Sequence, residues 1–320
     1  MHISQGMPHL TSMRRCGDSI DDLSCITVVI PTLNEAEAIG RVIEEVLSVG
    51  VPKDSIIIVD GGSTDGTVEI ASKYGVRVIR QRGRGKADAI KTALEYVDTE
   101  YMLVMDGDYT YPARYIPRLV EVARKMGSDE VIGVRLASSG SQRLLYRLGN
   151  WLLTKTFNVL FGTNLHDVLS GMYLVRVESL RDAMMEMGGF SVEAEIAAHM
   201  VSTGKLVTEV PIEYRRRLGR KKLGVKHGIL IFRDMIRLAA RYNPMFLLFL
   251  MGALLIIPGL VMGAYVGYWY IFYGIKYYLK GLIAIMLFLI GLQFLGMAVL
   301  SLYLKRMEFR LRRAMESLHR

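Results

Sequence analysis

Three groups of acidic and small polar residues are the part of this 320-residue sequence that could carry chemistry. They are Pro31-Thr-Leu-Asn-Glu35, Asp60-Gly-Gly-Ser-Thr-Asp-Gly-Thr67 and Asp106-Gly-Asp108, and each follows a short apolar run. Carboxylates without partners are costly near a protein core, so clustered ones usually bind hydroxyl groups or cations. Ribose hydroxyls suit Glu35 and Asp60. An aspartate pair one residue apart suits a divalent cation that bridges a diphosphate, such as Mg²⁺ or Mn²⁺.

Each motif taken alone has an ordinary structural explanation. An Asp-Gly-Asp sequence is commonly a turn, and a Ser-Thr-Asp sequence is commonly the start of a helix. We expect Ser63 or Thr64 to cap the helix that follows, a role that is compatible with ligand binding. The order and spacing of all three motifs together nevertheless indicate a binding site.

The elements that must position these motifs follow an alternating pattern. The predicted strands are Ile26–Pro31, Ile56–Asp60, Val76–Arg80, Tyr101–Met105 and Glu130–Val134, and the predicted helices are Glu35–Ser48, Thr64–Tyr74, Gly85–Val97 and Arg114–Met126. This alternation predicts an α/β domain with a mostly parallel sheet that helices cover on both faces. Ligands of such sheets bind beyond the carboxyl ends of the strands, where the three acidic motifs fall.

The later part of the chain predicts helices at Arg143–Phe161 and Ser191–Thr203, a strand at Leu206–Pro211, and an amphipathic helix at Gly224–Tyr242. In this last helix one arc is basic, and it contains Lys226, Arg233, Arg237 and Arg241. A basic amphipathic helix next to an apolar span is typical of a helix that lies on an anionic membrane surface. An ordinary surface helix of the preceding domain is the alternative.

Two long runs without a charged residue follow, Pro244–Ile275 and Gly281–Leu304. Each exceeds the roughly 20 apolar residues that are needed to cross a bilayer core. A buried helix of a large soluble core is the other interpretation of one such run, but two runs in tandem favour a transmembrane hairpin.

The net charge of +9 is concentrated beside these runs. Residues 205–241 carry a net +8, residues 305–320 carry +4, and Lys276 and Lys280 add +2, which leaves −5 for residues 1–204. A protein that binds nucleic acid normally has its positive charge around the working cleft, so this distribution argues against nucleic acid as a partner. It predicts that the N-terminal domain and the C-terminal tail are cytoplasmic.

The two cysteines, Cys16 and Cys25, are too few for a disulfide framework, and we expect them to be free thiols in a reducing cytosol. The first 24 residues contain no apolar segment of the signal-peptide type. The expected organisation is a flexible extension (1–24), a catalytic domain (25–223), an interfacial helix (224–243), two transmembrane helices (244–304) and a basic cytoplasmic tail (305–320).

The chain resembles glycosyltransferase family 2 with the GT-A fold over roughly residues 24–215, and in particular the polyprenyl-phosphate hexose synthases, such as dolichol-phosphate mannose and glucose synthases. Besides the three acidic motifs, the resemblance rests on Gly83-Arg-Gly-Lys86, Asp167-Val-Leu-Ser-Gly-Met172 and the basic run Pro211–Leu223. It implies a membrane-anchored enzyme that moves one hexose or N-acetylhexosamine from a nucleotide-sugar to dolichyl or another polyprenyl phosphate, with Mg²⁺ or Mn²⁺ as cofactor.

The resemblance also implies a set of site residues. The nucleotide-sugar site comprises Pro31, Thr32, Asn34, Glu35, Asp60, Gly62, Ser63, Asp65, Lys86, Asp106 and Gly107. Asp106 and Asp108 are expected to bind the metal and, together with Asp167, to be the catalytic carboxylates. The acceptor phosphate is expected to contact Arg135, Ser170 and Arg217. Arg143 and Arg147, on the predicted helix between Arg135 and Ser170, are expected to be additional contacts. For Asp167 we favour the positioning of an arginine over action as a base.

Two positions depart from the family pattern. Thr110 stands where mannose synthases often carry a glutamine that binds the metal, and the basic run permits either Arg216 or Arg217 at its key position. The sequence is more similar to archaeal transferases that use UDP-sugars, which favours a UDP-sugar over GDP-mannose. Transfer to diacylglycerol or to a lipid diphosphate remains an alternative. A non-catalytic membrane scaffold is a more distant one, because a scaffold would not need the three carboxylate motifs that this sequence contains.

Overall fold

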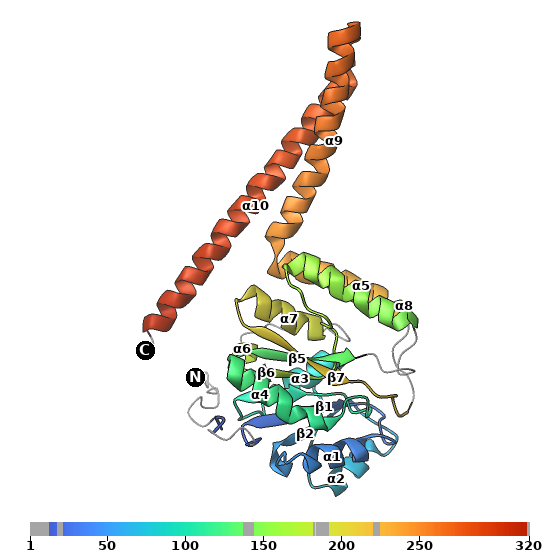
Figure 1. Cartoon of the computed structure of the whole chain (residues 1–320), viewed down its shortest axis with the longest axis vertical. Coiled ribbons are helices and arrows are strands. Elements are labelled where there is room, and N and C mark those ends of the chain that lie inside the picture. The colour runs from blue at the N-terminus through green and yellow to red at the C-terminus, as the bar shows by residue number, and fades with distance from the viewer. Residues whose placement is uncertain are drawn as a thin grey trace, which may run out of the picture. The chain divides into compact units, whose positions relative to one another are not determined.

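The computed structural model of the chain describes residues 13–17, 22–136, 144–181, 183, 192–219 and 225–318. The chain forms two compact units, which divide between Met235 and Ile236. The first unit contains the sheet and its covering helices, and the second contains the long apolar helices (Figure 1).

The first unit is built on a seven-stranded sheet of the described residues, in the order β3-β2-β1-β4-β6-β5-β7. The strands are β1 (Ile26–Thr32), β2 (Ile56–Asp60), β3 (Arg77–Arg80), β4 (Tyr101–Val104), β5 (Glu130–Leu136), β6 (Tyr173–Arg176) and β7 (Val207–Glu213). β6 runs antiparallel to both of its neighbours, and the other strand pairs are parallel. The predicted mostly parallel sheet is confirmed, but the sequence pattern did not reveal the four residues of β6.

Helices cover both faces of this sheet (Figure 1). One apolar core lies under α1 (Ile39–Ser48), α2 (Thr67–Lys73) and α4 (Ile116–Met126), and the other lies under α3 (Lys86–Leu94), α6 (Val177–Arg181) and α7 (Val192–Ser202). Two 3-10 turns, η2 (Lys53–Ser55) and η3 (Ala113–Tyr115), precede β2 and α4. Every residue of β2 is buried, and the first four are apolar, as expected for a parallel strand that is covered on both faces.

The expected cap of the second helix is wrong. α2 begins at Thr67, and its N-cap residue is Gly66, which has a φ of 94° and no capping side chain. Ser63 and Thr64 are used elsewhere, because both bond to Asn34 in the neighbouring loop. Tertiary contact between the two loops therefore displaced the local capping role.

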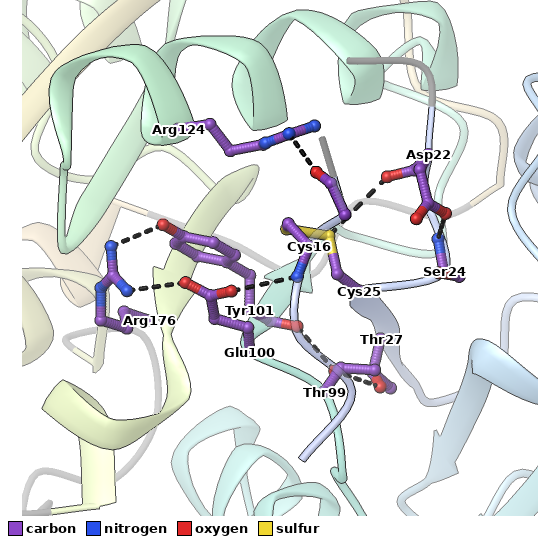
Figure 2. Close-up of a disulfide and its surroundings, with 11 residues drawn as sticks. Cys16, Asp22, Ser24, Cys25, Thr27, Thr99, Glu100, Tyr101, Arg124 and Arg176 are labelled. Atoms are coloured by element: carbon purple, nitrogen blue, oxygen red, sulfur yellow. Dashed lines mark hydrogen bonds and ion pairs between the residues drawn. A yellow bond between two sulfur atoms is a disulfide. The ribbon is translucent and has the colours of Figure 1, made fainter. Parts of the chain in front are cut away.

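The expectation of free thiols is also wrong, because Cys16 and Cys25 form a disulfide (Figure 2). The described residues near Cys16 pack on the domain instead of extending freely. Arg14 forms an isolated β-bridge with Thr99, and the N–H of Cys16 donates to Glu100 Oε2 (3.1 Å). These contacts bring the two cysteines to a Cα–Cα distance of 4.7 Å, a proximity that their spacing alone does not reveal.

The second unit is a pair of helices, α9 (Pro244–Tyr273) and α10 (Tyr278–Leu318). Residues 244–273 and 278–304 are long and apolar enough to cross a membrane, with mean hydropathies of 2.6 and 2.5. Small residues let the two backbones approach, since a Cβ on Gly259 would lie 3.1 Å from the carbonyl oxygen of Ala284. α10 extends to Leu318, so it includes the described part of the predicted tail.

Candidate active site

The first two acidic motifs meet in a loop cluster at the carboxyl ends of β1 and β2. Thr32 lies opposite Asp60 in the register of these strands. Asn34 joins the loops, because its N–H donates to Ser63 Oγ (2.9 Å) and its Oδ1 accepts from the N–H of Thr64 (2.9 Å). Asn34 has a φ of 54°, a left-handed conformation that asparagine adopts more readily than most residues.

Asp65 extends this cluster to Glu35. Its Oδ2 accepts from the N–H of Ala36 (3.0 Å), and its Oδ1 accepts from the hydroxyl (2.5 Å) and N–H (3.1 Å) of Thr67. The Thr67 hydroxyl oxygen in turn accepts from the N–H of Glu35 (2.9 Å). Desolvation opposes the charge on Asp65, but these hydrogen bonds outweigh it and hold the pKa of Asp65 below its ordinary value.

The Asp60 carboxylate is largely satisfied by its own loop. Its Oδ2 accepts from the N–H groups of Gly62 (2.8 Å) and Ser63 (3.0 Å). Gly62 has a φ of 97°, which lets the loop turn back on the carboxylate. Asp60 is therefore held in place before any ligand binds.

Three further residues that were predicted to contact the nucleotide-sugar, namely Thr32, Gly107 and Pro31, lie on β1 or shortly after β4 and form the floor beside this loop. Thr32 is buried, and its hydroxyl donates to the carbonyl oxygen of Val59 (3.4 Å). Gly107 lies so close to Thr32 that an added Cβ would be 3.0 Å from Thr32 Cγ2. Pro31 is half-buried on β1. These residues shape the floor, and the Thr32 hydroxyl faces the strand instead of a ligand.

Arg217 joins the first motif to the third. Its Nη2 lies 2.5 Å from Glu35 Oε1, and its Nη1 lies 3.3 Å from Asp108 Oδ2. The N–H of Leu218 donates to the carbonyl oxygen of Asp108 (3.2 Å), so this segment runs beside the third motif. The sequence predicted that Arg217 contacts the acceptor phosphate. The structure has it between two carboxylates of the donor motifs instead, because carboxylates this close attract a guanidinium.

Lys86 binds the other aspartate of the third motif. Its Nζ lies 2.6 Å from Asp106 Oδ1 and 2.6 Å from Glu193 Oε1. Burial opposes the charge on Lys86, but the two carboxylates outweigh it and raise its pKa well above the ordinary value. Lys86 is the first residue of α3, whose backbone N–H groups and dipole favour a bound anion.

The residues present fit a divalent cation. Among the described residues no three His, Cys, Asp or Glu side chains form one group, so the protein itself offers Asp106 and Asp108. Mg²⁺ commonly uses one or two carboxylates and completes its shell with substrate phosphates and water. Burial and the charge of Asp106 raise the pKa of Asp108. Thr110 contacts this aspartate pair, because its hydroxyl donates to Asp108 Oδ1 (2.5 Å).

Arg135 and Asp167 form a buried ion pair on the predicted acceptor side. Arg135 Nε and Nη2 each lie 2.6 Å from a carboxylate oxygen of Asp167. Asn150, on α5 (Leu144–Phe161), accepts from Arg135 Nη2 (3.1 Å) and donates to Asp167 Oδ1 (2.9 Å). Burial opposes the charge on Asp167, but Arg135 outweighs it and lowers the pKa of Asp167. This is the geometry of a carboxylate that positions an arginine.

The segment 167–171 contacts both Arg135 on the predicted acceptor side and Asp106 on the predicted donor side. Its carbonyl at Leu169 accepts from Arg135 Nη2 (3.2 Å). At its other end Gly171 lies against Asp106, since a Cβ on Gly171 would be 2.2 Å from Asp106 Oδ2. The predicted donor and acceptor residues are therefore neighbours, and only a glycine permits this approach.

Ser170, Arg147 and Arg143 are the other residues predicted to contact the acceptor phosphate. Ser170 is buried, and its hydroxyl donates to the carbonyl oxygen of Gly133 (2.5 Å), so it faces β5 in this structure. Arg147 is exposed on α5, one turn before Asn150. Arg143 lies outside the described residues.

Comparison with known proteins identifies the family. The model of glycosyl transferase family 2 matches residues 27–183. Glycosyltransferase AglJ of Haloferax volcanii is 32% identical over 282 residues, which cover 86% of this chain and 92% of that protein. The chain belongs to glycosyltransferase family 2. The predicted family and the predicted class of enzyme are thus confirmed.

Two more similarities bear on this family 2 glycosyltransferase. The dolichyl-phosphate hexose transferase of Haloferax volcanii is 36% identical over 208 residues, covering 64% of this chain and 88% of the relative. Glucosyl-3-phosphoglycerate synthase from Mycobacterium tuberculosis, solved with Mg²⁺ and UDP, has a TM-score of 0.57 at 23% identity, covering 72% of this chain and 85% of that structure. The structural likeness confirms the GT-A type of fold.

Sequence reasoning missed three residues of the site. Asn150 lies one turn after Arg147 on a predicted helix, and this spacing could have suggested it. Glu193 opens a predicted helix, but nothing local connects it with Lys86. The hydroxyl oxygen of Tyr111 accepts from the N–H of Gly171 (2.7 Å), a contact between segments 60 residues apart that no local pattern indicates.

Proposed function

We propose that this enzyme transfers one hexose or N-acetylhexosamine from a nucleotide-sugar to dolichyl or another polyprenyl phosphate, with inversion at the anomeric carbon. The donor is a UDP-sugar in preference to GDP-mannose, and the cofactor is Mg²⁺ or Mn²⁺. One observation carries the proposal: the segment 167–171 bonds to Arg135 and packs against Asp106, so the arginine proposed for the acceptor phosphate adjoins the carboxylates proposed for the donor site. The dolichyl-phosphate relative and the structural neighbour with Mg²⁺ and UDP support it.

Attack by a phosphate oxygen needs little help from a general base. A phosphate monoester has a second pKa of about 6, so the nucleophile is largely ionised at neutral pH. Asp167 is paired with Arg135 and has a lowered pKa, which suits a positioning role better than proton abstraction. Asp106 and Asp108 would hold a divalent cation, which supplies positive charge to the departing diphosphate. Lys86 and Arg135 reduce the repulsion between the anionic donor and the anionic acceptor.

Exposed apolar side chains support a membrane location for the acceptor. α5 has an exposed stripe at helical spacing that consists of Arg147, Leu148, Trp151, Leu152, Lys155 and Val159. α8 (Val225–Tyr242) exposes Leu230, Phe232 and Ile236 together with Arg233 and Arg237. Helices with apolar and basic exposed residues bind anionic membrane surfaces. We expect both helices to lie at headgroup depth, with the polyprenyl chain in the lipid.

The acceptor assignment is tested with the full-length protein in detergent, MnCl₂, and a panel of UDP- and GDP-sugars. Polyprenyl phosphate and the corresponding polyprenol are compared at equal concentration with the sugar that gives turnover. We expect the phosphate to be glycosylated and the alcohol to remain unmodified. Equal rates on both lipids would contradict the proposal. Product masses distinguish transfer to diacylglycerol or a lipid diphosphate, and nucleotide-sugar binding without any transfer would indicate a scaffold.

The proposed orientation has the catalytic unit and the end of α10 on the cytoplasmic side. Limited proteolysis of sealed inside-out vesicles should then cut both the N-terminal unit and the segment after Lys305. Vesicles of the opposite orientation serve as the control, in which both should be protected. Protection of either segment in the inside-out vesicles would contradict this topology.

A further inference from the structure

Glu193 is a buried carboxylate that has no role in the proposed reaction as described so far. It is the second residue of α7, and its side chain is 8% exposed. Its Oε1 lies 2.6 Å from Lys86 Nζ, and Lys86 Nζ lies at the same distance from Asp106 Oδ1. One ammonium group therefore has two carboxylate partners, although one would balance its charge.

A second buried anion needs a physical reason. Taking a carboxylate out of water carries a desolvation penalty of several kcal/mol, and one ion pair with Lys86 already exists without Glu193. Part of the compensation is local. Lys86 lies at the first position of α3, where the helix dipole disfavours a cation, and Glu193 lies in the first turn of α7, where the dipole favours an anion.

The remaining reason for a second carboxylate is that Asp106 must bind two cations in the proposed reaction. Its Oδ1 accepts a hydrogen bond from Lys86 Nζ. In the proposed reaction the same carboxylate also binds a divalent cation, which draws on its charge and repels the ammonium. With Asp106 as its sole partner, Lys86 would lose its anchor when the donor diphosphate arrives. Glu193 binds Lys86 from α7, a separate element, and is free of this conflict.

We propose that Glu193 is a positioning residue for the donor, which holds the Lys86 ammonium beside the diphosphate while Asp106 binds the divalent cation. This inference rests on the proposed function, because it takes Asp106 as a cation ligand. Glu193 acts through Lys86 and not on the substrate itself. Its contribution is therefore expected in donor binding with the cation present, more than in the stability of the fold.

The test measures UDP binding to the full-length protein in detergent by calorimetry, with and without MnCl₂. Glu193→Gln keeps the size of the side chain and an acceptor oxygen but removes the charge. We expect it to raise the Kd of UDP with Mn²⁺ about 10-fold or more, with a smaller change for UDP alone and no loss of Tm. Glu193→Asp should recover part of the affinity. Glu178→Gln, an exposed carboxylate before α7, is the matched control and should change neither quantity.

A second comparison separates positioning from packing. In a Lys86→Met background Glu193→Gln should have no further effect on the Kd, because the residue through which Glu193 acts is gone. An unchanged Kd in the single variant, an equal effect in both backgrounds, or a fall in Tm without a change in Kd would each overturn the inference alone. A wild-type protein whose UDP binding does not respond to Mn²⁺ would contradict the proposed function, and this inference with it.

Discussion

The two halves of the donor site are held together in different ways. On the half that contains Asn34, Asp60 and Asp65, the polar side chains bond mainly to backbone groups of the two adjoining loops. On the half that contains Asp106 and Asp108, the partners are charged side chains from other segments, namely Lys86 and Arg217. The first half is held by hydrogen bonds within its own loops, whereas the second balances its carboxylates with cationic side chains from distant segments.

Because of this difference, we expect substitutions in the two halves to affect stability and the rate of transfer differently. The hydrogen bonds from loop backbone groups to Asn34, Asp60 and Asp65 mainly set the shape of the site. Charged partners at a reaction centre act where charge develops in the reaction, and their effects on rate are larger. Substitutions in the charged half should therefore reduce transfer, and substitutions in the loop half should show first in stability.

The largest effect is expected for Asp108→Asn. The substitution removes one of the two charged cation ligands, so transfer should fall by roughly 10³-fold while the fold is retained. The measurement is the rate of sugar transfer to polyprenyl phosphate, with the circular dichroism spectrum as the check on folding. EDTA added to the wild type should have the same effect, and excess Mn²⁺ should reverse it. Transfer that survives both treatments would rule out the cation-dependent mechanism.

Arg135→Lys should come next, because lysine cannot form the paired hydrogen bonds of a guanidinium. We expect the KM for polyprenyl phosphate to rise roughly 10- to 100-fold, with little change in the KM for the nucleotide-sugar. Steady-state kinetics with each substrate varied in turn measures both quantities. Arg118→Lys, in an exposed ion pair on α4, is the matched control and should behave as wild type. An equal rise in both KM values would contradict the acceptor role.

Asn34→Ala probes the loop half. It removes the acceptor for the Thr64 N–H and puts alanine at a φ of 54°, which together should destabilise the protein by about 1–3 kcal/mol. Asn34→Gly keeps the conformation available but not the acceptor, so its loss of stability should be smaller. Thermal unfolding of the three proteins gives the comparison. If Ala and Gly destabilise equally, the backbone conformation of Asn34 is not a source of strain for alanine.

Glu130 offers a contrast with the paired Glu193, because no cation among the described residues contributes to the shift of its pKa. Burial raises its pKa from 4.5 to about 8, and its Oε2 has no hydrogen-bond partner among the described residues. Unfolded Glu130 ionises above pH 4.5 while the folded form stays protonated, so stability should fall by roughly 4 kcal/mol between pH 4.5 and pH 8 on this account. Glu130→Gln should flatten that dependence and be more stable than wild type at pH 8. A steeper dependence in the variant would contradict this assignment.

The smallest effect on transfer is expected from loss of the disulfide. Cys16 and Cys25 lie near Glu100 at the amino end of β4, whereas the site is at the carboxyl ends of the strands (Figure 2). Cys16→Ser should lower stability by about 2–3 kcal/mol, as for a loop of some ten residues, and leave the transfer rate unchanged. Reductant should lower the Tm of the wild type but not of the variant. A transfer rate that falls with reductant at constant Tm would show that the cysteines affect the site directly.

The sequence by itself determined the parts of this protein that depend on local patterns. Alternating runs predicted six of the seven described strands, because a buried parallel strand such as β2 is a nearly continuous apolar run. The two charge-free runs predicted α9 and the apolar part of α10, since the length of such a run is a local property. The acidic motifs at strand ends were found for the same reason, because the end of a strand and its carboxylate are adjacent in the chain.

Only the tertiary structure decided which side chains meet. β6 is four residues long and lies antiparallel between β4 and β5, so no repeat in the sequence indicates it. Arg217 reaches Glu35 across 182 positions, and Glu193 reaches Lys86 from another helix. The Cys16–Cys25 disulfide likewise requires the segment near Arg14 to pair with Thr99. Long-range ion pairs form wherever burial brings opposite charges together, and burial is a property of the folded chain.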